Sequence, residues 1–149
     1  EVYSGRSVSA AAVAAHEVGH AVQHAVGYKW LNLRSQLVPV ANFSGRIMNI
    51  VIISMLFGMS FLHLFGLNTI IYVLIVAQAT ITLVTVITLP VEYDASNRAL
   101  AWLTTSGTIT TAEHEKAGDA LKWAARTYLV AALASMTQLA YYLSMLGRD

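Results

Sequence analysis

The fold is decided by residues 47–91, IMNIVIISMLFGMSFLHLFGLNTIIYVLIVAQATITLVTVITLPV, a stretch of 45 residues that contains no Lys, Arg, Asp or Glu. A single helix of this length would measure about 68 Å, roughly twice the hydrocarbon core of a bilayer. The chain must therefore fold back, and Gly66 and Asn68 near the middle suit a turn. We predict a two-helix membrane hairpin with spans at about 47–65 and 69–89, rather than a pair of buried helices in a soluble protein.

The composition of the whole chain agrees with an integral membrane protein. Of its 149 residues, 56% are hydrophobic and 11% are charged, and the mean hydropathy is +0.58. The formal net charge is only +1, so we expect no nucleic-acid partner, because such partners are held by many cationic side chains. Cysteine is absent, which excludes disulfides, thiolate metal sites and cysteine nucleophiles. Any metal must be bound by His, Asp or Glu.

Further helices are expected after the hairpin. Pro90 suits the first turn of a short helix, VEYDASNRALAWLT, which would end near Gly107. Thr110 and Glu113 form a capping-box motif, so a long helix should begin near residue 111 and continue into a third apolar span at 127–146. The sequence therefore predicts an all-α integral membrane protein, with residues 1–149 forming one membrane-embedded domain.

The basic residues predict the orientation in the cell membrane. Eight of the nine lie before the first span or between the second span and the third, none lies at the hairpin tip, and Arg148 follows the third span; the eight are Arg6, Lys29, Arg34, Arg46, Arg98, Lys116, Lys122 and Arg126. Cytoplasmic flanks of membrane helices are enriched in Lys and Arg. We therefore expect a multi-pass protein with both ends of the hairpin on the cytoplasmic side and its tip outside.

The motif that carries chemistry is His-Glu-Val-Gly-His at residues 16–20, within the helix-favouring context AAAVAAHEVGHAVQHAV. His16 and His20 are one helical turn apart and can bind one metal ion from the same helix face. Glu17 lies about 100° around the helix, where it can act on a metal-activated water without being a ligand. His24 lies about 12 Å along the helix from His16 and is assigned to packing or to a hydrogen bond with a metal ligand. His63 and His114 are also expected to be structural.

A catalytic zinc ion needs a third protein ligand, and the topology points to Glu92 or Asp94. A hairpin returns the chain to the membrane face that it left, so the histidine helix before it and LPVEYDASNRAL after it lie on the same side. Two carboxylates directly after a long uncharged run, beside a zinc motif, favour a functional role. Residue types and spacing alone leave the choice between Glu92 and Asp94 open.

The combination of HEVGHAVQH, LRSQLVPVANF and LPVEYDASNRAL resembles the YugP-type family of neutral zinc metallopeptidases of bacterial membranes, over essentially the whole chain. The layout is also similar to that of HtpX-like and CAAX-protease-like membrane gluzincins. The resemblance implies His16, His20 and Glu92 as zinc ligands, Glu17 as catalytic base, and Asp94 as a residue that orients a histidine. Related enzymes carry an aspartate one turn after the ligand glutamate, whereas this sequence has Ser96 there.

The motif and the resemblance together predict a Zn²⁺-dependent endopeptidase that hydrolyses peptides or membrane proteins by zinc-activated water with Glu17 as base. The distribution of basic residues places its site at the cytoplasmic membrane surface. The resemblance also implies an N-terminal segment upstream of this sequence, or a membrane protein partner in its place. Tyr93, Arg98 and His114 remain open as the oxyanion-stabilising group. The alternatives are a catalytically silent zinc protein acting as an adaptor or structural module, which would have no use for Glu17, and a transporter, which would need more intramembrane polar groups.

Overall fold

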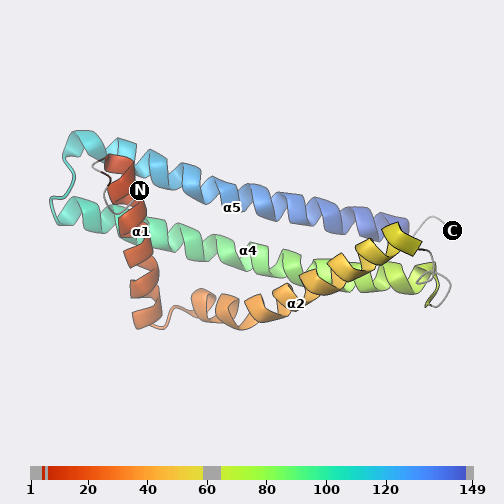
Figure 1. Ribbon diagram of the computed structural model, residues 1–149. Helices are drawn as coiled ribbons and strands as arrows, with labels where there is room; N and C mark the ends of the chain where they lie inside the picture. The colour runs from red at the N-terminus through yellow and green to blue at the C-terminus, as the bar shows by residue number, and fades with distance from the viewer. Residues whose placement is uncertain (1–4, 6, 59–64, 147–149) are drawn as a thin grey trace. The chain divides into compact units, whose positions relative to one another are not determined.

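The computed structural model describes residue 5, residues 7–58 and residues 65–146, and all regular secondary structure within these ranges is helical. The helices are α1 (Val8–Ala25), α2 (Lys29–Gly58), α4 (Leu67–Thr105) and α5 (Thr111–Met145), as Figure 1 shows. The all-α prediction is confirmed.

Helix α1 has well-defined ends. The hydroxyl of Ser7, its N-cap residue, accepts a hydrogen bond from the Ala10 N–H at 3.2 Å, which satisfies one of the free donors at the helix start. Beyond its last residue, Gly27 adopts a φ of 64°, a left-handed conformation that glycine adopts without steric cost. The chain turns there and α2 begins two residues later.

Within the described ranges, two helices are long and apolar enough to cross a membrane by length and composition: Lys29–Leu56 within α2, and Leu67–Thr105. They contain most of the predicted spans 47–65 and 69–89, although residues 59–64 lie outside the described ranges. Gly66, with a φ of 75°, precedes α4, whereas Asn68 is part of its first turn.

The expectation of a separate short helix starting at Pro90 is wrong, because α4 continues through this residue to Thr105. Proline removes one backbone donor and costs roughly 3 kcal/mol inside a helix. The turns that follow are tightly packed, with Val91 and Ala95 completely buried, and this packing offsets the cost.

Helix α5 begins as the capping-box motif predicts. The Glu113 carboxylate accepts hydrogen bonds from the Thr110 N–H at 2.9 Å and from the Thr110 hydroxyl at 2.8 Å. These two bonds from Thr110 hold the pKa of Glu113 below its usual value. Residues 127–146 fall almost entirely within this helix, and their insertion as a third span stays a prediction.

The described helices contribute to two compact units. The first contains Glu1–Leu33 and Ile87–Val130. Its core combines side chains of α1, α4, α5 and the turn before α5, many of them small: Ala12, Ala15, Ala99, Leu103, Ile109, Ala117 and Leu121. On α4 the buried positions 91, 95, 99 and 103 recur every four residues, so one stripe of the helix faces this core.

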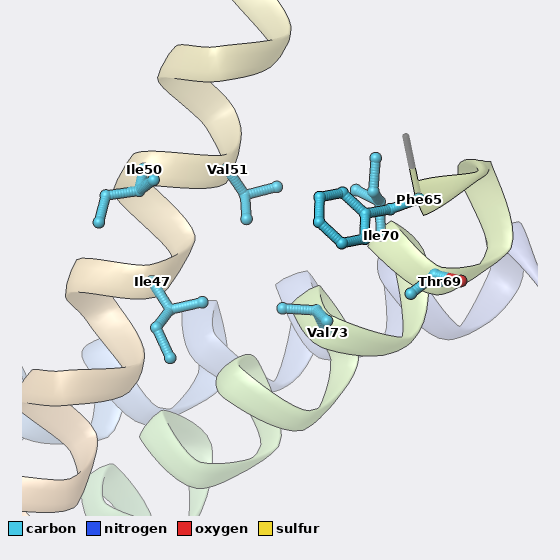
Figure 2. A pocket seen from close by; sticks show the side chains of 7 residues that line it. All are labelled: Ile47, Ile50, Val51, Phe65, Thr69, Ile70 and Val73. Atoms are coloured by element: carbon cyan, nitrogen blue, oxygen red, sulfur yellow. The ribbon is translucent and has the colours of Figure 1, made fainter. Parts of the chain in front are cut away.

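The second unit contains Arg34–Val86 and Ala131–Asp149, and its core includes Met48, Val51, Ile70, Leu74, Ala77 and Tyr142. The buried Gln78 amide and Thr82 hydroxyl of α4 both contact the Ser135 hydroxyl of α5, at 3.0 and 2.7 Å. Figure 2 shows a pocket of about 240 Å³ in this unit, where Ile47 and Val51 approach Ile70 and Val73. None of the described residues that line it has a titratable side chain.

Candidate metal centre

Three potential metal donors meet in the first unit. His16 and His20 project from α1, and Glu92 reaches them from α4, 76 residues after His16. His16 Nε2 lies 3.1 Å from His20 Nε2 and 3.1 Å from Glu92 Oε2, and His20 Nε2 lies 3.5 Å from the same carboxylate oxygen. Each residue therefore presents one donor atom to a common point.

The distances and the chemistry of this cluster fit a zinc ion. Ligand atoms about 2.0 to 2.2 Å from a tetrahedral ion are about 3.3 to 3.6 Å apart, close to the three separations observed. Two imidazole nitrogens and one carboxylate oxygen are a donor set that catalytic zinc uses. The Glu92 side chain is only 2% exposed, whereas those of His16 and His20 are 14% and 23% exposed. The cluster is thus closed on the Glu92 side and accessible on the histidine side.

Small residues allow α1 to approach α4 closely enough for these contacts. A Cβ atom at Gly19 would lie 2.6 Å from the carbonyl oxygen of Ala95, closer than real Cβ atoms come. Gly19 stands between the two histidines in sequence, and Ala95 lies three residues after Glu92. A bare backbone at Gly19 therefore sets the separation of the helices that carry the donors.

Asp94 does not join the cluster, because a glutamine that the sequence reasoning missed lies between it and the histidines. His20 Nδ1 is 3.0 Å from Gln23 Oε1, and the Gln23 amide donates to Asp94 Oδ2 at 2.8 Å. Asp94 also accepts a hydrogen bond from Arg98 Nε at 2.6 Å. Glu92 rather than Asp94 thus lies with the histidines, and Asp94 reaches His20 only through Gln23.

Ser96, one turn after Glu92 on α4, contacts His16. Its hydroxyl oxygen lies 3.2 Å from His16 Nδ1. Each histidine therefore has a polar neighbour at Nδ1, opposite the nitrogen that faces Glu92. Such outer partners orient the imidazole rings of metal sites.

The remaining candidates are not among the three clustered donors. Glu17 is exposed on α1, next to His16 in sequence. His24 and His114 are exposed and are not among the three clustered donors, while His63 lies outside the described residues. Of the expected oxyanion groups, Arg98 is paired with Asp94, and Tyr93 is 41% exposed.

Tyr28 is a second residue near the site that sequence reasoning missed. The guanidinium carbon of Arg98 lies 5.9 Å from the centre of its ring. Burial, followed by the nearby Asp94 carboxylate, raises the pKa of the Tyr28 phenol, so it stays protonated at neutral pH. The spacing of three residues places Gln23 on the same helix face as His20, so the sequence alone could have revealed this contact. Tyr28 lies in the turn before α2, where no helical spacing indicates its neighbours.

Comparison with known proteins gives two matches. A family model described as "Putative neutral zinc metallopeptidase" matches residues 1–147. The chain is 40% identical over 151 residues to a protein of Bacillus subtilis (strain 168) named "Putative membrane protease YugP". This match covers 99% of the chain and 64% of the relative, so the chain spans just under two thirds of that protein. No solved structure shows a significant match.

Proposed function

Because the chain belongs to the family of neutral zinc metallopeptidases, we propose that His16, His20 and Glu92 bind its zinc ion and that Glu17 is the general base of a membrane endopeptidase. The observation that carries the proposal is the triangle of donor atoms, with sides of 3.1, 3.1 and 3.5 Å. Three protein ligands leave a fourth tetrahedral position for water or substrate, which is typical of catalytic rather than structural zinc.

Bound zinc would supply Lewis-acid activation of a water molecule and polarisation of the scissile carbonyl. Glu17 accepts a proton from the attacking water as its oxygen bonds to the carbonyl carbon. The same carboxylate then gives this proton to the leaving amine as the C–N bond breaks, so that one water is consumed for each peptide bond. The exposure of Glu17 supports this role, since a base must be accessible to water and substrate.

Variants of the clustered residues test the assignment through zinc content. His16→Ala, His20→Ala and Glu92→Ala should each lose the metal, because two ligands hold zinc poorly. Glu17→Gln should retain one zinc per chain and lose hydrolysis of an unstructured protein such as casein. Loss of zinc from Glu17→Gln comparable to that from the histidine variants would make Glu17 a ligand and overturn the mechanism.

Two matched variants complete this test. Asp94→Asn should retain zinc with an affinity weakened about tenfold to hundredfold, as expected for an indirect partner. His24→Ala, a change to an exposed histidine on the same helix, should leave the zinc content unchanged. If Asp94→Asn lost zinc and Glu92→Ala kept it, the third ligand would be Asp94. If every variant kept zinc, the ion would lie elsewhere.

We further propose that the site faces the cytoplasm and acts on peptides or membrane proteins near the bilayer surface. The relative's name and the two apolar helices support membrane association, and the distribution of Lys and Arg supports the orientation. Single cysteines at Ser35, Asn68 and Ser106 would test it in a chain without native cysteine. An impermeant thiol reagent added to intact cells should label only position 68. Labelling of position 35 or 106 would contradict the orientation.

A further inference from the structure

The side-chain amide of Gln23 can have only one orientation. Its nitrogen lies 2.8 Å from the Val91 carbonyl oxygen and 2.8 Å from Asp94 Oδ2, and Gln23 is fully buried. Carbonyl and carboxylate oxygens only accept hydrogen bonds. If the amide nitrogen and oxygen were exchanged, the amide oxygen would face both the Val91 carbonyl oxygen and Asp94 Oδ2, and none of these atoms could donate a hydrogen bond. Each unsatisfied buried group costs about 1–3 kcal/mol. The amide oxygen therefore faces His20.

This orientation decides which nitrogen of His20 carries the proton. Gln23 Oε1 lies 3.0 Å from His20 Nδ1, and an amide oxygen accepts but cannot donate. The proton of the neutral ring is consequently on Nδ1, and Nε2 keeps its lone pair. That Nε2 is the atom 3.1 Å from His16 Nε2, and a ring nitrogen binds a metal through its lone pair.

We propose that Gln23 is a positioning residue, which holds His20 in the Nδ1–H tautomer and presents Nε2 to the metal. Asp94 in turn holds Gln23, since its Oδ2 accepts from both the Gln23 amide and Arg98 Nε. Ser96 has no equivalent effect on His16, because a hydroxyl can donate or accept and so selects neither tautomer. The benefit to zinc binding rests on the proposed function, but the tautomer itself does not.

The tautomer can be observed directly in the metal-free protein. The chain, labelled with ¹⁵N-histidine and held in detergent micelles with a chelator, is examined by long-range ¹H–¹⁵N correlation at a pH where the imidazoles are neutral. His20 should show the Nδ1–H pattern alone, whereas the exposed His24 of the same helix should show an average of both tautomers. An Nε2–H or averaged pattern for His20 would overturn the proposal.

Two substitutions then separate positioning from mere packing. Gln23→Leu removes the acceptor, so His20 should become a mixture of tautomers and zinc affinity, measured by chelator competition, should fall about tenfold to hundredfold. Gln23→Met keeps the length of the side chain without a strong acceptor for Nδ1–H, so it should show the same mixture of tautomers and the same loss of affinity as Gln23→Leu. Gln36→Leu, at an exposed position of α2, is the matched control and should change neither.

The outcomes distinguish this inference from the proposed function. If the unmodified chain binds no zinc, the proposed function fails, while the His20 spectrum still reports on Gln23. If the chain binds zinc and Gln23→Leu changes neither tautomer nor affinity, Gln23 is only a packing residue and the inference is wrong. If Gln23→Leu does not fold, the unmodified chain and Gln23→Met decide the question.

Discussion

The substitution Gly19→Ala should damage the metal centre without removing a donor atom. The added Cβ would lie 2.6 Å from the Ala95 oxygen and 3.2 Å from its Cα and carbonyl carbon. All three are backbone atoms, so no side chain can rotate away. Reaching even the 3.0 Å below which real contacts are essentially never seen requires a shift of at least 0.4 Å, and a comfortable 3.4 Å requires 0.8 Å. Helices α1 and α4 must therefore separate.

The cost of this separation can be set against the usual benefit of alanine. Overpacking a tight interface costs about 1–3 kcal/mol, whereas replacing glycine by alanine inside a helix gains up to about 1 kcal/mol. The free energy of unfolding should thus fall modestly, by up to about 2 kcal/mol. Zinc affinity should fall by about tenfold, because a shift of 0.4 to 0.8 Å is comparable with the roughly 0.5 Å tolerance of a metal site.

Gly118→Ala provides the matched control, since Gly118 is also buried in a helix of the same unit. A Cβ there would meet only the Leu100 side chain, at an ordinary 3.6 Å. This variant should be neutral or slightly stabilised and should bind zinc normally. Thermal unfolding and chelator competition measure both quantities. If Gly19→Ala behaved like Gly118→Ala in both, close backbone contact would not set the geometry of the site.

Two further predictions concern helix α5. Glu113→Ala should destabilise the start of the helix at neutral pH. Because bonds from Thr110 lower the pKa of Glu113, its contribution to stability is fully present above the ordinary value of 4.5 and is lost as the pH falls through the lowered pKa. Hydrogen exchange near residue 111 would measure this pH dependence. Ser135→Ala should lower the free energy of unfolding by only about 0.6 kcal/mol, measured by thermal unfolding, because Gln78 and Thr82 can still donate to the backbone carbonyl of residue 135 at 3.2 Å. A loss above about 2 kcal/mol would mean that the Ser135 hydroxyl is their main partner.

The parts of the fold that could be predicted are those that the sequence encodes locally. The uncharged run indicated two long helices, and the Thr110–Glu113 motif located the start of α5. The hairpin argument brought the region of Glu92 to the histidine helix, and family resemblance selected Glu92 over Asp94. The structure places Glu92, rather than Asp94, with the histidines.

The parts that could not be predicted depend on contacts between distant segments. Pro90 is a helix-starting signal by itself, and only the packing of the following turns shows why α4 continues through it. In the sequence Gln23 is an ordinary polar residue of a helix, and its role follows only from its hydrogen bonds to Val91 and Asp94, which are far away along the chain. The position of Gly19 was likewise uninformative without Ala95, because a glycine in a helix can serve many purposes.

The small residues between α1 and α4 have a consequence for the entropy of the site. Ala12, Ala15 and Gly19 on one helix, and Ala95 and Ala99 on the other, have no side-chain rotamers to lose when the helices come together. Nor have they any rotamers with which to absorb a displacement. The close approach of Gly19 to the Ala95 backbone limits the spacing of the helices that carry the donor atoms, so metal binding requires little ordering of these small residues. The donor triangle is therefore preorganised before an ion arrives, and a methyl group added at Gly19 would displace it.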